Sequence, residues 1–135
     1  MSRLSRVGLA LLGLTLACSS AEEQAAQRSA AQVARAIEVL RNAPNSAKAQ
    51  PLATLARLGC TGADVCKTRD ACTAAYTEHV DALTLTAAAK QKLTDGNNLE
   101  AAKLLNASEQ KLANADAKVT ACTDAEGSLR RRYKL

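Results

Sequence analysis

The apolar residues of this chain, which are mostly alanine and leucine, constrain its fold more than any other feature. The 135-residue sequence has no phenylalanine and no tryptophan, and its only aromatic residues besides His79 are Tyr76 and Tyr133. Alanine favours helix but buries little apolar area per residue. β-Branched and aromatic residues, which favour strands, are scattered and show no alternating run. The sequence therefore predicts an all-α protein with a thin core that depends on cross-links.

The N-terminal segment has the pattern of an export signal. Arg3 and Arg6 supply a positive n-region, and residues 7–16 form an uncharged apolar h-region that is too short to span a bilayer. The apolar run ends in the sequence LTLAC, in which a small residue stands directly before Cys18. This segment resembles the lipobox of bacterial lipoproteins.

The resemblance implies that residues 1–17 are a signal peptide and that Cys18 carries diacylglycerol on its thiol and an acylated amino group. Two or three such palmitate-type chains would hold the protein on a membrane, because each buried methylene contributes roughly 0.8 kcal/mol. Ser19 stands where an aspartate would retain a lipoprotein at the inner membrane, so the resemblance favours the outer membrane. The alternative is ordinary secretion with cleavage after Ala21, because Ser19 and Ala21 also form a small-x-small site.

Four helices are expected from apolar residues spaced three and four apart and from the residues that start and stop helices. Ser20 and Glu23 form a capping box before the first helix, and Asn97 with Glu100 has the same form before the last. Asp64 is expected to cap the third helix. The expected bounds are about 20–42, 51–58, 65–93 and 97–122.

These helices predict one domain. Residues 18–127 are expected to form a small bundle of three to four helices with a long antiparallel hairpin, stapled by disulfides. Residues 128–135 are expected to be a mobile basic tail.

The two long helices are expected to pack against each other about a turn at Gly96 and Asn97. Residues at equal distances from this turn then face each other, which places Cys72 opposite Cys122. The expected buried stripes are Cys72, Tyr76, Val80, Leu83 and Ala87 on the third helix and Ala101, Leu105, Ser108, Leu112, Ala115, Val119 and Cys122 on the fourth. The spacing also fits a coiled coil, but flanking charge pairs are not evident, so a compact bundle is preferred.

With Cys18 lipidated, four cysteines remain, and an even number in an exported protein predicts two disulfides. The preferred pairing joins Cys72 to Cys122 across the hairpin and Cys60 to Cys66 around a small loop. The alternative joins Cys66 to Cys122 and Cys60 to Cys72. The spacings do not match those of zinc, thiol-redox or haem sites, so the cysteines are interpreted as structural and no metal or cofactor is expected.

Few other residues suggest chemistry. His79 is interpreted as part of a solvated helix face, and the sequence contains no phosphate-binding glycine loop, so an enzyme is not expected. Arg130, Arg131, Arg132 and Lys134 are a candidate site for lipid head groups, lipopolysaccharide or an acidic protein, the competing interpretation being a solubilising end. The net charge of +5 falls close to zero once the signal and tail are set aside, which argues against nucleic acid.

Together these features favour a lipid-anchored envelope protein that acts as a non-enzymatic structural or interaction accessory to another envelope protein. The alternative is a small ligand-, metal- or peptide-binding module in the periplasm or on the cell surface. A ligand-sized apolar cavity would favour this alternative.

Overall fold

The computed structural model describes residues 20–135, so the expected signal peptide and Cys18 lie outside the described residues. The described elements, in chain order, are α1 (Ala21–Asn42), the short 3₁₀ turn η1 (Asn45–Ala47), α2 (Ala49–Arg57), α3 (Ala63–Thr94) and α4 (Asn98–Tyr133). No strand occurs between residues 20 and 135, and the predicted all-α class is confirmed. The bounds of the first three α-helices agree with the predicted ones to within about two residues.

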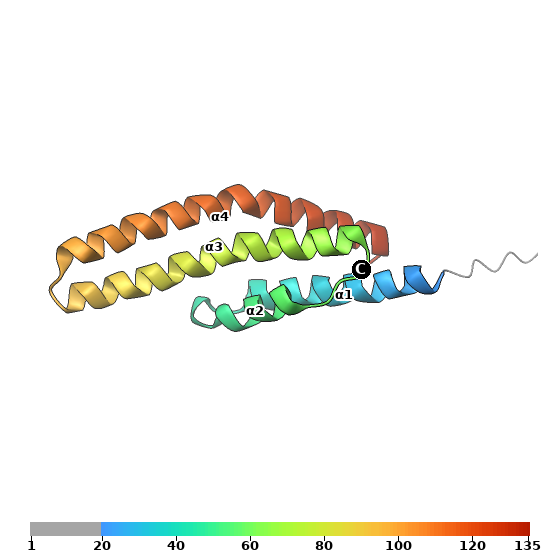
Figure 1. The fold of residues 1–135 in the computed structure, drawn as a ribbon, viewed down its shortest axis with the longest axis horizontal. Coiled ribbons are helices and arrows are strands. Elements are labelled where there is room, and N and C mark those ends of the chain that lie inside the picture. The colour runs from blue at the N-terminus through green and yellow to red at the C-terminus, as the bar shows by residue number, and fades with distance from the viewer. Residues whose placement is uncertain (1–19) are drawn as a thin grey trace, which may run out of the picture.

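α3 and α4 form a long hairpin, and α1 and α2 lie along only part of it (Figure 1). α1 and α2 pack at the end where α4 finishes, while the α3–α4 turn projects beyond them. The edge of the α1–α2 layer lies near Thr84 and Ala87, which share a small cleft with Asn45 and Ser46. We call residues 88–108 the arm of the hairpin and the remainder of α3 and α4 its root.

The hydrophobic core lies where α1 and α2 meet the root. It consists mainly of aliphatic side chains, as the composition predicted. Its largest fully buried apolar side chains are Ile37, Leu40, Leu55, Leu129, Val33 and Val65. The arm contributes none of these, so most of the apolar stabilisation is concentrated in the root.

Small side chains line the seam between α3 and α4. One line of buried residues recurs every seven positions on each helix: Thr68, Ala75, Ala82 and Ala89 on α3, and Ala101, Ser108, Ala115, Cys122 and Leu129 on α4. Ser108 Oγ donates to the carbonyl of Ala82 at 3.0 Å across this seam. A seven-residue repeat is typical of a coiled coil. The arm is therefore a two-helix, coiled-coil-like hairpin, and the bundle is confined to the root.

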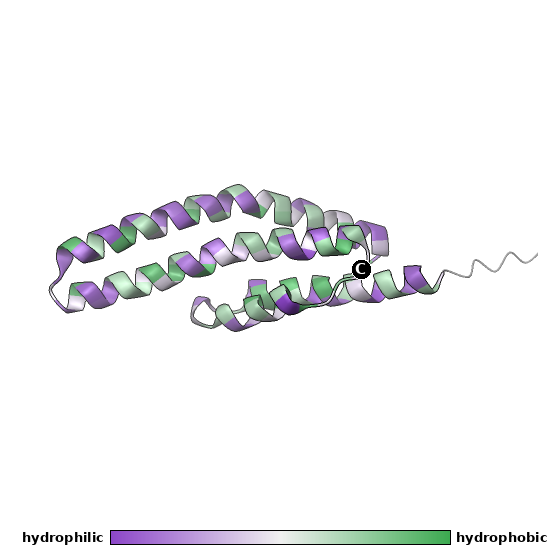
Figure 2. Cartoon of the chain, viewed as in Figure 1, coloured by the Kyte–Doolittle hydropathy of each residue, from purple (hydrophilic) through white to green (hydrophobic). Residues whose placement is uncertain are grey.

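The predicted buried stripes are correct at this seam and wrong at their edges. Four residues expected to be buried are exposed: Ala87, Leu105, Leu112 and Val119. Three others are only partly buried: Tyr76, Val80 and Leu83. Two helices alone bury one narrow line of side chains, and a wider stripe is buried only where a third element covers it. Figure 2 shows the apolar residues left along the uncovered part of the hairpin.

Both disulfides have the preferred pairing. Cys72–Cys122 joins α3 to α4 in the root, with an S–S distance of 2.07 Å and both side chains buried. Cys60–Cys66, with an S–S distance of 1.99 Å, ties the α2–α3 connection to the first turns of α3. The alternative pairing is therefore wrong.

Two of the three predicted N-caps are confirmed. Ser20 Oγ accepts from the Glu23 amide at 3.1 Å, and Asn97 Oδ1 accepts from the Glu100 amide at 3.2 Å. The predicted Asp64 cap is wrong, because α3 begins at Ala63, two residues earlier than expected, and Gly62 takes the N-cap position with a φ of 96°. Such a positive φ favours glycine.

The predicted mobile tail is also wrong, because α4 continues to Tyr133 instead of ending near Cys122. Leu129 is 2% exposed and Tyr133 is 8% exposed, and the Tyr133 hydroxyl donates to Asp64 Oδ1 at 3.2 Å. Leu129 lies seven residues after Cys122 and Tyr133 lies four residues after Leu129, so both are on the helix face that carries the stripe. Gly127 lies inside the helix, where glycine costs only about 1 kcal/mol. The folded domain therefore extends past residue 127.

Glu78 forms the main ion-pair cluster between α3 and α4. Its carboxylate accepts from Lys118 Nζ at 2.7 Å and pairs with Lys111 Nζ at 2.9 Å, and Lys111 also pairs with Asp81 at 3.1 Å. Hydrogen bonds from Lys118 and then Lys111 lower the pKa of Glu78 to about 2. These contacts are the flanking charge pairs that were not evident in the sequence.

The lowered pKa of Glu78 predicts acid sensitivity. A carboxyl whose folded-state pKa is depressed stabilises the fold above its unfolded pKa, near 4.3, and loses this contribution as the pH falls towards 2. Between pH 5 and pH 2, wild-type stability is therefore expected to fall more than that of Glu78→Gln, as measured by urea unfolding. Glu109→Gln, on the exposed face of α4, is the matched control and should follow the wild type. Parallel curves for the wild type and Glu78→Gln would contradict the prediction.

Candidate functional site

Arg130, Arg131 and Arg132 lie on the last turn of α4, and Lys134 follows as its C-cap residue. Arg130 Nε pairs with Glu126 at 2.9 Å, and Arg132 pairs with Asp64 at 3.3 Å. Arg131 bonds to the Ser128 hydroxyl at 3.1 Å, and Lys134 is exposed. Two of the four predicted anion-binding residues are thus engaged by carboxylates of the protein itself.

Acidic residues also surround this end of α4. Glu22, Glu23 and Asp64 share a cleft with Arg132 and Tyr133, and Ser20 lies at the same cleft. Burial and then the charge of Asp64 raise the pKa of Tyr133 above its usual value. Positive and negative charges are therefore mixed at this end of α4. The site is expected to attract anions less strongly than the run of basic residues in the sequence predicted.

His79 lies in the root beside a small cleft. Its ring makes an edge-on contact with Tyr76, with 6.5 Å between centroids, and it shares the cleft with Asp116 and Lys48. Glu78, its neighbour in sequence, turns instead to the lysines of α4. Within residues 20–135, no group of three His, Cys, Asp or Glu side chains is placed to hold a metal ion.

Lys48 is a buried cation that the sequence analysis missed. It is 7% exposed, and its Nζ donates to the carbonyls of Leu40 and Arg41 at 3.0 and 2.9 Å. The same atom lies 5.9 Å from the centre of the Tyr76 ring. Lys48 therefore caps the C-terminal end of α1 and fixes the turn that leads into α2.

An exposed apolar stripe runs along α4. Leu105, Leu112 and Val119 are seven residues apart and are 40%, 41% and 44% exposed. Leu93 and Leu99 are exposed on either side of the α3–α4 turn. Exposed apolar residues that recur on one helix face are typical of a surface that binds another helix.

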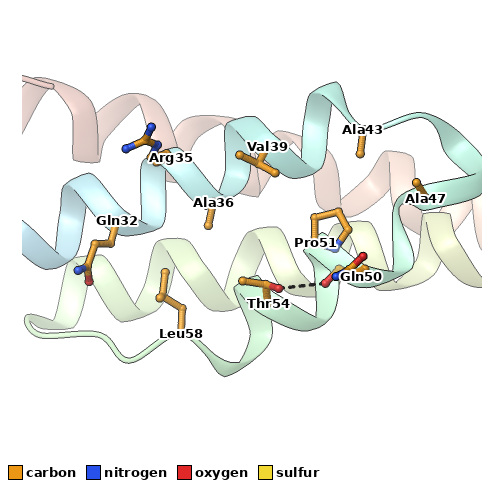
Figure 3. A pocket seen from close by; sticks show the side chains of 10 residues that line it. All are labelled: Gln32, Arg35, Ala36, Val39, Ala43, Ala47, Gln50, Pro51, Thr54 and Leu58. Carbon is orange, nitrogen blue, oxygen red and sulfur yellow. Dashed lines mark hydrogen bonds between the residues drawn. The ribbon is translucent and has the colours of Figure 1, made fainter.

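A second apolar feature, a groove between α1 and α2, was also missed. It is open to solvent and has a volume of about 610 Å³, and six of its ten lining residues are apolar: Ala36, Val39, Ala43, Ala47, Pro51 and Leu58. The remaining four are polar or charged: Gln32, Arg35, Gln50 and Thr54. The connection from α1 to α2 closes one end of the groove beside Ala43 and Ala47, and Arg35 and Gln32 lie towards the other end (Figure 3). A volume of this size is in the range of small-molecule sites.

Comparison with known proteins returns no family model, no curated protein and no solved structure that matches this chain. None of the helices between residues 20 and 135 combines the length and apolar character that a membrane span requires.

Proposed function

We propose that this protein is a lipid-anchored component of the bacterial envelope, held on the outer membrane by acyl chains at Cys18. In this proposal it acts as a non-enzymatic structural or interaction accessory to another envelope protein. The single observation that carries the accessory role is the stripe of Leu105, Leu112 and Val119, which recurs every seven residues and stays uncovered. An apolar helix face of this kind is what a partner helix buries on binding.

The arrangement of the hairpin supports this role. Ser20, two residues after Cys18, shares a cleft with Arg132 and Tyr133 at the end of α4, whereas the α3–α4 turn lies at the opposite end of the molecule (Figure 1). An anchor at Cys18 would therefore place the C-terminal end of α4 beside the bilayer and leave the stripe, which runs from the root into the arm, accessible to a protein partner. At the root, Arg131 and Lys134 have no ion pair with residues 20–135 and are the basic residues left for anionic lipid or lipopolysaccharide.

The anchoring and accessory roles are testable in one preparation. Intact-mass measurement of protein purified from envelope membranes is expected to show a chain that begins at Cys18 and carries acyl chains. The Cys18→Ser variant is expected to lack the acyl chains and to be absent from the membrane fraction. A photo-cross-linking residue at position 112 of the anchored protein is expected to give one discrete adduct. The same residue in place of Asn114, which is exposed and lies on the opposite side of α4, is the matched control.

Each role has its own contradicting outcome. An uncleaved chain of unmodified mass would rule out the anchor. Equal cross-linking from positions 112 and 114, or none from either, would rule out the stripe as the partner surface, whatever the state of Cys18.

The groove between α1 and α2 favours a second candidate function, a small ligand-binding module. It is a ligand-sized apolar space that does not include any residue of the α4 stripe. The two functions are compatible, because the groove and the stripe are on different helices.

A further inference from the structure

We infer that the groove between α1 and α2 binds a single saturated acyl chain with an anionic head group, a medium-chain carboxylate of about ten carbons. This inference goes beyond the accessory role and gives the second candidate function a ligand class. It depends on neither the lipid anchor nor a protein partner, so its failure would leave both untouched.

The wall of the groove matches an unbranched hydrocarbon chain. Val39 is 56% exposed although its neighbours along the groove are small apolar residues, so a large apolar side chain faces solvent here. The lining contains no aromatic ring, and the one side-chain hydrogen bond between its residues joins the Thr54 hydroxyl to the Gln50 carbonyl at 3.1 Å. A flexible chain adapts to such a smooth aliphatic surface, whereas a flat ring system has no partner for stacking.

The charge at the groove selects an anion. Arg35 is the one charged residue in the lining, and it makes no ion pair or hydrogen bond with any residue between 20 and 135. It lies away from the end that the α1–α2 connection closes (Figure 3). Glu38, the nearest acidic residue in sequence, is exposed and does not line the groove. An amphiphile that enters tail first therefore leaves its carboxylate within reach of an unpaired guanidinium.

The length of the groove sets the length of the chain. Arg35 on α1 and Ala43, the C-cap residue of that helix, are eight residues apart, which corresponds to about 12 Å at 1.5 Å per residue. An extended hydrocarbon gains about 1.25 Å per carbon, so about ten carbons fill this distance. In longer chains the extra carbons would remain in solvent at the open end and would move the carboxylate beyond Arg35.

Ligand titrations test the proposal directly. Amide NMR shifts would be followed in the full chain carrying Cys18→Ser, so that no acyl chain of the protein competes. Sodium decanoate is expected to shift the amides of Ala36, Ala43 and Ala47 saturably below its micelle concentration. Affinity is expected to rise about twofold per methylene from octanoate to decanoate, because the open groove buries about half of each methylene, and to level off at dodecanoate. Decanol is expected to bind about fivefold more weakly, because the interaction with an exposed arginine is modest.

Two pairs of variants give the controls. Arg35→Ala is expected to lower the affinity for decanoate about fivefold and to leave the affinity for decanol unchanged. Arg28→Ala, on the same helix but outside the lining, should change neither affinity. Val39→Asp is expected to lower the affinity for decanoate at least tenfold. Leu112→Asp, on the α4 stripe, is expected to leave this affinity unchanged. Because Val39 is largely exposed, circular dichroism is expected to show that Val39→Asp stays folded. Saturable shifts confined to other helices, no saturable shift, or decanol equal to decanoate would overturn the proposal.

Discussion

Replacing Cys72 and Cys122 together by alanine is expected to lower the free energy of unfolding by about 4 kcal/mol. In the chain-entropy model, a cross-link that closes a loop of this length, with 50 residues of sequence separation, restricts the unfolded chain by about that amount. Typical small domains have only about 5–15 kcal/mol in total, and the apolar core of this protein is small. Guanidinium unfolding of the double variant, followed by circular dichroism, measures the loss.

The second disulfide provides the matched control. Cys60→Ala with Cys66→Ala opens a loop with a sequence separation of only 6, so the expected loss is roughly 2 kcal/mol. The comparison tests loop length specifically, because both double variants remove two sulfurs and differ mainly in the length of the loop that the disulfide closes. We therefore expect the loss in unfolding free energy to be larger for the Cys72–Cys122 variant. Equal losses would mean that loop closure does not control the stability of this fold.

The second large effect is expected at the end of α4. Leu129→Ala should lower the free energy of unfolding by about 3 kcal/mol, because Leu129 is 2% exposed in the core and truncation of a buried leucine leaves a cavity. A mobile tail beginning at residue 128 predicts no change, so this variant separates the helical C-terminus from the tail that the sequence suggested. Urea unfolding is a sufficient measurement.

Leu105→Ala is the control for the chemistry of this substitution. Leu105 is 40% exposed in the arm, and its truncation is expected to cost less than about 1 kcal/mol. If Leu129→Ala costs no more than Leu105→Ala, the last turns of α4 do not pack against the core as described.

The features predicted correctly are those that depend on local spacing. Helix positions follow from apolar periodicity and from Ser20 and Asn97, which bond to the amides three residues ahead. The pairing of Cys72 with Cys122 follows from the register of one short turn. None of these inferences requires knowledge of how the helices pack against one another in the folded protein.

The features that the sequence analysis missed depend on tertiary contacts. A stripe of apolar residues on α4 does not reveal which face of the helix α1 and α2 leave uncovered, so Leu112 was expected to be buried although it is 41% exposed. Lys48 appears as an ordinary linker residue until α1 presents its last carbonyls to it. No sequence pattern indicates the groove. Its lining residues, such as alanine, proline and glutamine, come from two helices, and the distance between these helices is known only from the folded structure.

The position of the Cys72–Cys122 bond also determines how far the hairpin can come apart. Because the arm has only alanine-sized contacts and no third helix, thermal fluctuations are expected to separate its two helices from the tip inward. The covalent link stops this fraying inside the root, at Cys72 and Cys122. A partner can therefore bend or splay the outer part of the hairpin while α1, α2 and the groove between them remain folded.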